Sequence, residues 1–177
     1  MMFYDLYRFF TRRSTWPIVG LLVVVIMLSF QAFAGRRAAY FPDDQLLDDR
    51  RWYTPADVSQ LLSDLGDRRY IYGATELTLD IIYPICYGML FAILISQLWG
   101  PRRDWMLLAP ILTVFFDLSE NILIVYMISS FNGSETNVAW VASVCTLAKT
   151  LFFLLSLLLI LNGGILGLFR TRYNRNR

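Results

Sequence analysis

The sequence predicts an all-α integral membrane protein, a four-transmembrane-helix bundle that forms a single domain over residues 1–177. Hydrophobic residues make up 56% of the chain and charged residues only 17%, whereas an average globular chain is about 25% charged. Four apolar stretches reach or approach the roughly 20 residues that a helix needs to cross a bilayer. They cover about residues 17–34, 77–98, 106–128 and 138–161. Because backbone amides find no water in lipid, each stretch is expected to be a helix. A soluble helical bundle is disfavoured, since the stretches lack polar faces.

Tryptophan and arginine positions support these boundaries and give an orientation. Four tryptophans lie at predicted span ends, where amphipathic rings favour the headgroup level; they are Trp16, Trp99, Trp105 and Trp140. With the N-terminus inside, arginines outnumber acids in the cytoplasmic segments, and acids outnumber arginines in the outer ones. This bias predicts a multi-pass protein of the cell (inner) membrane with both termini cytoplasmic. Arg36 and Arg37 are the exception, because they follow the first span on the outer side.

The first span also has a second interpretation, as a cleaved signal peptide. Arg12 and Arg13 precede an apolar run that ends in Ala-Phe-Ala at residues 32–34, before Gly35, and such a pattern is typical of a signal peptide with its cleavage site. The apolar run is long for a signal peptide, however, and bulky phenylalanines lie close to the cut. An uncleaved helix is therefore favoured.

The outer loop, residues 35–75, is the one sizeable segment between spans, and it is too short to bury a core of its own. Thr54 and Pro55 form a helix start, with an acid three residues after the threonine, and Gly66 supplies a stop. Apolar residues between them follow a helical spacing: Val58, Leu61, Leu62 and Leu65. We expect a short amphipathic helix that lies on the membrane surface or forms a lid over the bundle. The DDQLLDDRR run upstream is expected to be a solvated, charge-paired turn.

Composition excludes several classes of site. The chain has no histidine and two cysteines, which rules out histidine metal sites, histidine-dependent hydrolytic triads and histidine-ligated haem. No metal and no cofactor is expected. A calcium site is disfavoured because the loop aspartates lack EF-hand spacing; these are Asp43, Asp44, Asp48 and Asp49. A formal net charge of +2 does not indicate a nucleic-acid partner.

Four charged residues fall inside the predicted spans, namely Asp80, Asp117, Glu120 and Lys149. Each costs about 2.5–3.5 kcal/mol at a helix centre that faces lipid. They are therefore expected to face one another or a cavity. Three carboxylates around one lysine leave an excess of negative charge, so at least one carboxyl is expected to be protonated at neutral pH. The alternative is structural: an ion pair of Lys149 with Asp117 or Glu120 that joins the third and fourth spans.

Helical spacing groups these charges with other polar residues on one face of each span. The faces are Glu76, Asp80, Tyr83 and Tyr87 in the second span, Thr113, Asp117, Glu120 and Asn121 in the third, and Ser143, Thr146, Lys149 and Thr150 in the fourth. Pro84 frees the carbonyl of Asp80, four residues earlier, for a cation, a proton or a hydroxyl donor. The predicted ligand-binding residues are Asp80, Tyr83, Tyr87, Asp117, Glu120, Asn121 and Lys149.

Two residue pairs carry weaker signals. Cys86 and Cys145 lie at similar depths in the second and fourth spans and are interpreted as apolar fillers rather than a disulfide. Gly163 and Gly167 form a GxxxG pattern, which suits close helix packing.

Two family resemblances rest on particular runs of sequence. The runs YTPADVSQLLSDLG, LTLDIIYPICYG and FFDLSEN, within residues 53–121, resemble a family of uncharacterised four-span bacterial membrane proteins with no assigned activity. The layout also resembles the EXPERA family of sterol-isomerase-like and sigma-2-receptor-like proteins. That resemblance implies that Asp80 and an acid of the outer loop face a lipophilic cavity. The chain lacks the histidine that sterol isomerisation uses in that family.

Three functional hypotheses follow. In the first, the polar core binds a lipophilic or cationic small molecule, with coupling to protons left open. In the second, the protein is an intramembrane acid-base enzyme acting on a lipid, with one of the span acids as the acid and Tyr83 or Lys149 as its partner. In the third, it is a structural accessory subunit. The expected partners are the lipid bilayer, a lipophilic ligand, and either a second copy of the chain or a larger membrane complex.

Overall fold

The computed structural model describes residues 16–41 and 46–175, and these form helices without any strand. The elements are α2 (Trp16–Tyr40), the 3₁₀ helix η2 (Leu47–Asp49), α3 (Pro55–Leu65), α4 (Arg68–Glu76), α5 (Leu79–Trp99), the 3₁₀ helix η3 (Pro101–Leu107), α6 (Leu108–Ser130) and α7 (Val138–Arg175). Within the described residues, four helical segments are long and apolar enough to cross a membrane: Pro17–Tyr40, Arg68–Trp99, Arg103–Ser130 and Val138–Gly167. The prediction of an all-helical chain with four such helices is confirmed.

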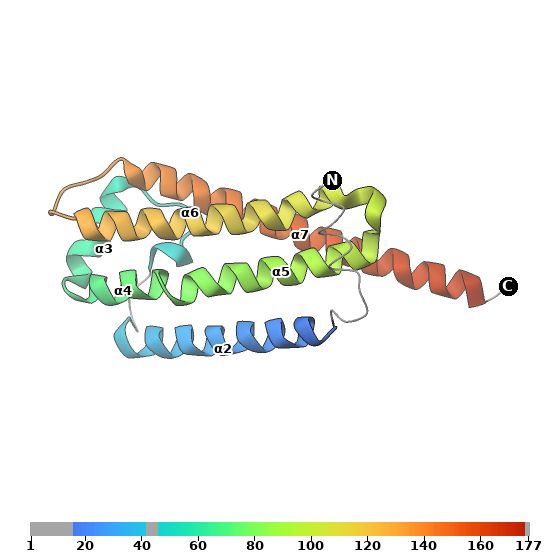
Figure 1. Ribbon diagram of the computed structural model, residues 1–177. Helices are drawn as coiled ribbons and strands as arrows, with labels where there is room; N and C mark the ends of the chain where they lie inside the picture. Colours follow the sequence, from blue (N-terminus) through green and yellow to red (C-terminus); the bar gives the residue numbers. More distant parts are fainter. Residues whose placement is uncertain (1–15, 42–45, 176–177) are drawn as a thin grey trace.

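The long helices lie roughly side by side (Figure 1). α6 and α7 pack along each other, α5 packs against both, and α2 packs against α5. Two glycines permit the closest approaches. A Cβ atom at Gly88 of α5 would lie 2.2 Å from Val114 of α6, and one at Gly163 of α7 would lie 2.8 Å from Leu98 of α5. Nothing lies within 4 Å of a Cβ atom at Gly167, so only half of the GxxxG pair serves helix packing.

Several predicted helix ends were wrong. The first helix continues past residue 34 to Tyr40, and the last continues past residue 161 to Arg175. Figure 1 shows α7 reaching beyond the other helices. Hydropathy locates the apolar part of a helix, whereas arginine is a good helix former and does not end one. The predicted loop also contains α4, which a short break at residues 77–78 separates from α5.

The amphipathic helix α3 was predicted correctly. Thr54 Oγ1 accepts a hydrogen bond from the Asp57 amide (3.2 Å), and Asp57 Oδ2 accepts one from the Thr54 amide (2.7 Å). These bonds form a capping box, and the hydrogen bonds from Thr54 hold the pKa of Asp57 below its usual value. At Gly66 the chain turns with a φ of 53°. The apolar face of α3 packs over the ends of α6 and α7, so this helix forms a lid over the bundle.

The loop residues bury more than the sequence predicted. They contribute to a core at the end of the bundle near α3, here called the capped end; its members include Leu46, Leu47, Tyr53, Leu62, Tyr72, Ile124, Met127 and Ala142. Ser143 of α7 holds the loop at Tyr53. Its hydroxyl accepts a hydrogen bond from the Tyr53 amide (3.0 Å) and donates one to the Tyr53 carbonyl (2.5 Å). The loop has no core of its own, in line with its length, and instead shares one with α6 and α7.

Candidate functional site

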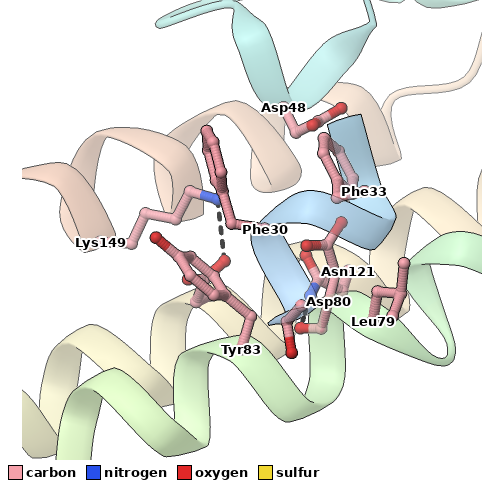
Figure 2. A pocket seen from close by; sticks show the side chains of 10 residues that line it. Phe30, Phe33, Asp48, Leu79, Asp80, Tyr83, Asn121 and Lys149 are labelled. Atoms are coloured by element: carbon pink, nitrogen blue, oxygen red, sulfur yellow. Dashed lines mark hydrogen bonds and ion pairs between the residues drawn. The ribbon is translucent and has the colours of Figure 1, made fainter. Parts of the chain in front are cut away.

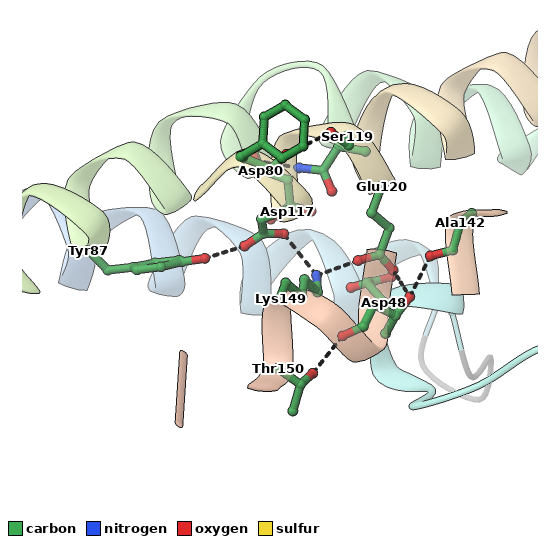
Figure 3. Close-up of polar contacts among 12 residues, drawn as sticks. Asp48, Asp80, Tyr87, Asp117, Ser119, Glu120, Ala142, Lys149 and Thr150 are labelled. Atoms are coloured by element: carbon green, nitrogen blue, oxygen red, sulfur yellow. Dashed lines mark hydrogen bonds and ion pairs between the residues drawn. The ribbon is translucent and has the colours of Figure 1, made fainter. Parts of the chain in front are cut away.

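Lys149 of α7 lies between two acids of α6, as Figure 3 shows. Its Nζ is 2.8 Å from Asp117 Oδ1 and 2.8 Å from Glu120 Oε2. The second oxygen of each acid is also bonded: Asp117 Oδ2 accepts from the Tyr87 hydroxyl, and Glu120 Oε1 accepts from Thr146 Oγ1 (2.6 Å). Glu120 is fully buried and Asp117 nearly so. Both ion pairs considered for Lys149 are therefore present, and they join α6 to α7.

The carbonyl that Pro84 frees has a partner inside the protein. Asn121 Nδ2 of α6 donates to the Asp80 carbonyl oxygen of α5, at 2.6 Å. The predicted availability of this carbonyl for a ligand was wrong, because the side-chain amide of the neighbouring helix takes the place of the missing helical hydrogen bond. The bond fixes the start of α5 against α6 and so positions the Asp80 carboxylate.

A cavity of about 190 Å³ lies beside these polar groups. Its lining comes from all four long helices and from η2: Ser29, Phe30 and Phe33 of α2, Asp48 of η2, Leu79, Asp80 and Tyr83 of α5, Asp117 and Asn121 of α6, and Lys149 of α7. Figure 2 shows Phe30 and Phe33 at the cavity near Asp80 and Tyr83. Aromatic and apolar residues of α2 and α5 thus share the lining with three carboxylates, a side-chain amide and the ammonium group of Lys149.

The structure brings most of the predicted site residues to this cavity. Asp80, Tyr83, Asp117, Asn121 and Lys149 all line it. The other two predicted residues, Tyr87 and Glu120, do not, and they instead bond to Asp117 and Lys149. Sequence reasoning did not find the lining residues Ser29, Phe30, Phe33, Asp48 and Leu79. The helical spacing of Phe30 and Phe33 places both on one face of the first span. Because that span is apolar on all sides, its sequence does not indicate which face points into the bundle.

Asp48 was expected in a solvated turn, and this was wrong. It is half-buried beside the cavity, next to the fully buried Leu47, and Tyr72 of α4 donates a hydrogen bond to its Oδ1 (2.9 Å). Burial raises the pKa of Asp48, and the neighbouring Asp49 adds to the increase. Of the other loop aspartates, Asp49 pairs with Arg37, whereas Asp43 and Asp44 lie outside the described residues.

Asp48 belongs to a cluster of three acids with Glu76, the last residue of α4, and Asp80, in the first turn of α5. One carboxylate oxygen from each lies within 4.8 Å of the others. In the part of the chain that the structure describes, the ion pairs use other acids: Asp49, Asp57, Asp117 and Glu120. None of the ion pairs found among the described residues involves the three clustered acids, and Lys149, which lines the same cavity, contacts Asp117 and Glu120 instead.

The two cysteines form no disulfide with each other, and both Cys86 and Cys145 are buried free thiols.

Comparison with protein-family models, curated proteins and solved structures gave no match. Both family resemblances therefore stay predictions. In the structure, Asp80 and the loop acid Asp48 line the same cavity, together with Phe30, Phe33 and Tyr83.

Proposed function

We propose that this protein is an integral membrane protein whose cavity binds a small lipophilic cation. The observation that carries the proposal is the pair Asp48 and Asp80, two carboxylates at the wall of a cavity with no basic partner among the described residues. A negative charge in a low-dielectric site is costly unless an opposite charge meets it. A cationic ligand supplies that charge.

The other lining groups support a lipophilic organic cation. Phe30, Phe33 and Tyr83 provide aromatic surface, and aromatic faces attract ammonium groups by roughly 0.5–2 kcal/mol. Lys149 does not offer its charge to an anion, because it already contacts two carboxylates. The volume of about 190 Å³ is below that of sites for drug-sized ligands, which favours a small amine or quaternary ammonium.

Membrane placement is part of the same proposal. The four apolar helices support insertion, and the arginine bias supports an inner-membrane location with both termini cytoplasmic. The capped end would then face away from the cytoplasm, and a cation would enter from that side. The charged residues of α6 and α7 face each other inside the bundle, which does not support an accessory subunit with outward polar faces. The lipid-modifying enzyme, coupling to protons and assembly with further chains stay predictions.

A binding measurement tests the proposal. The full chain is purified in detergent and titrated with benzyltrimethylammonium, whose charge does not depend on pH. We expect saturable binding that Asp80→Asn weakens about tenfold or more, since the loss of one charge contact of about 1.4 kcal/mol changes affinity tenfold. The matched control is Asp64→Asn, which neutralises an exposed acid of α3. Binding that is equal in both variants would contradict the proposal.

A further inference from the structure

The three-acid cluster at the capped end carries an inference beyond organic cation binding. Asp48, Glu76 and Asp80 come from three elements, η2, α4 and α5. They converge so that one oxygen from each lies within 4.8 Å of the others. Like charges this close repel strongly in a partly buried site, so the arrangement calls for either a shared proton or a bound cation.

Glu76 supplies the second, independent observation. Its side chain is fully buried, at 0% exposure, and its carboxylate oxygens accept no hydrogen bond from a hydroxyl, amide or basic group among the described residues; the group that Glu76 contacts is the carboxyl of Asp80. Buried polar side chains are hydrogen-bonded in the large majority of proteins, and each exception needs an explanation. Glu76 does not line the cavity of about 190 Å³ that is proposed to bind the organic cation. A ligand in that cavity therefore makes no direct contact with the Glu76 carboxylate. Its carboxylate is directed instead toward Asp48 and Asp80.

The chemistry of the cluster selects the ligand. Carboxylate oxygens without nitrogen or sulfur donors favour hard cations. Calcium binds oxygens at about 2.3–2.6 Å, so two of its ligands are separated by up to about 4.6–5.2 Å. Magnesium, at about 2.0–2.1 Å, spans about 4.0–4.2 Å. The three oxygens lie within 4.8 Å of one another, an upper limit within which both ions can bridge them. Magnesium, however, keeps several of its waters, whereas calcium takes about six to eight oxygen ligands, so a set of three protein carboxylates favours calcium. We propose that Asp48, Glu76 and Asp80 form a binding site for a divalent cation of the calcium class.

Neighbouring residues hold two of these acids in place. Tyr72, which is 1% exposed, donates to Asp48 Oδ1 at 2.9 Å and leaves the second oxygen of Asp48 for a metal. Asn121 fixes the Asp80 backbone at 2.6 Å. Hydrogen bonds of this kind orient ligating carboxylates in metal sites. Glu76 and Asp80 flank the break between α4 and α5, so a bound ion would also join these two helices to η2.

The site shares Asp48 and Asp80 with the organic cavity, and the two cations therefore compete. Glu76 separates the two functions, because it belongs to the metal site and does not line the cavity. The Glu76→Gln variant should lose calcium binding and retain binding of benzyltrimethylammonium. Calcium should weaken the binding of benzyltrimethylammonium to the wild type but not to this variant.

The test is thermal unfolding of the full chain in detergent, after chelation with EDTA and then titration with calcium chloride. At about a hundred times the Kd, we expect calcium to raise the Tm by roughly 5–10 °C. Glu76→Gln should abolish this rise without lowering the Tm of the metal-free protein, because the substitution removes a buried negative charge beside Asp48 and Asp80. Asp64→Asn, at an exposed acid of α3, should keep the full rise.

Three results would overturn the metal site: no calcium-dependent shift in the wild type, a full shift in Glu76→Gln, or an equal shift with magnesium at the same concentration. The binding of benzyltrimethylammonium is measured on the same samples. If that binding persists while the calcium response is absent, only the metal site is refuted. If calcium binds while the ammonium does not, only the proposed organic ligand is refuted.

Discussion

Replacing Lys149 by methionine tests the charged centre of the bundle. The change leaves Asp117 and Glu120 in place without the cation that contacts both at 2.8 Å. The side chains of Lys149, Asp117 and Glu120 are 19%, 12% and 0% exposed, so water compensates little of the loss. Removing one partner of a buried ion pair costs about 3–5 kcal/mol. Each acid keeps one hydroxyl hydrogen bond, which places the expected cost in the lower half of that range.

The assay is thermal unfolding in detergent, followed by tryptophan fluorescence. For a chain of this size, each kcal/mol shifts the Tm by about 2–4 °C, so Lys149→Met should lower the Tm by roughly 6–15 °C. A triple variant that also carries Asp117→Asn and Glu120→Gln should recover at least half of the loss. Arg51→Met is the surface control, because Arg51 is exposed and substitutions at such positions change stability by about 0.5 kcal/mol or less. A Tm within about 2 °C of the wild type in the single variant would refute a buried ionic centre.

Three further variants test packing, the loop and the helix cap by the same unfolding assay. Gly163→Ala should lose about 1–3 kcal/mol, because its Cβ atom meets the neighbouring helix, whereas Gly167→Ala, in open space, should be neutral or stabilising; equal effects would contradict the packing. Ser143→Ala should lose about 1–3 kcal/mol by breaking two buried hydrogen bonds, and an unchanged Tm would show that the loop is held otherwise. Asp57→Ala should lose about 1 kcal/mol at pH 7. Because the folded-state pKa of Asp57 is lowered, its stabilisation is present above the unfolded pKa and is lost as the pH falls through the folded-state pKa. The stability difference between the variant and the wild type should therefore shrink as the pH is lowered; a constant difference would contradict the carboxylate cap.

The elements with local signals could be predicted from the sequence. Twenty-residue apolar runs identify the four long helices, and Thr54, Pro55 and Gly66 delimit α3 because caps and stops act over a few residues. α4 has no such signal. Its sequence, RRYIYGATE, contains a glycine and several β-branched or aromatic residues, and its packing against α6 supports a helix that propensity alone does not indicate.

The candidate site was predictable to the extent that it follows helical spacing. Asp117, Glu120 and Lys149 meet because each occupies the polar face of its helix. Asp48 could not be found in this way, since its position depends on how the loop folds back and buries Leu47 at the capped end. Such contacts join residues distant in sequence, and spacing within one segment does not specify them.

The comparison of two ligands of nearly equal shape tests cation binding most directly. Benzyltrimethylammonium carries a permanent positive charge, and neopentylbenzene places a neutral carbon where the nitrogen stands. Their Kd values are measured on the wild-type chain by direct binding of the labelled cation and by competition with the neutral compound at a fixed detergent concentration. The Asp48 and Asp80 carboxylates and the aromatic side chains that line the cavity predict that the cation binds about tenfold tighter or more. Equal affinities, or a preference for the neutral compound, would contradict a cation-binding cavity.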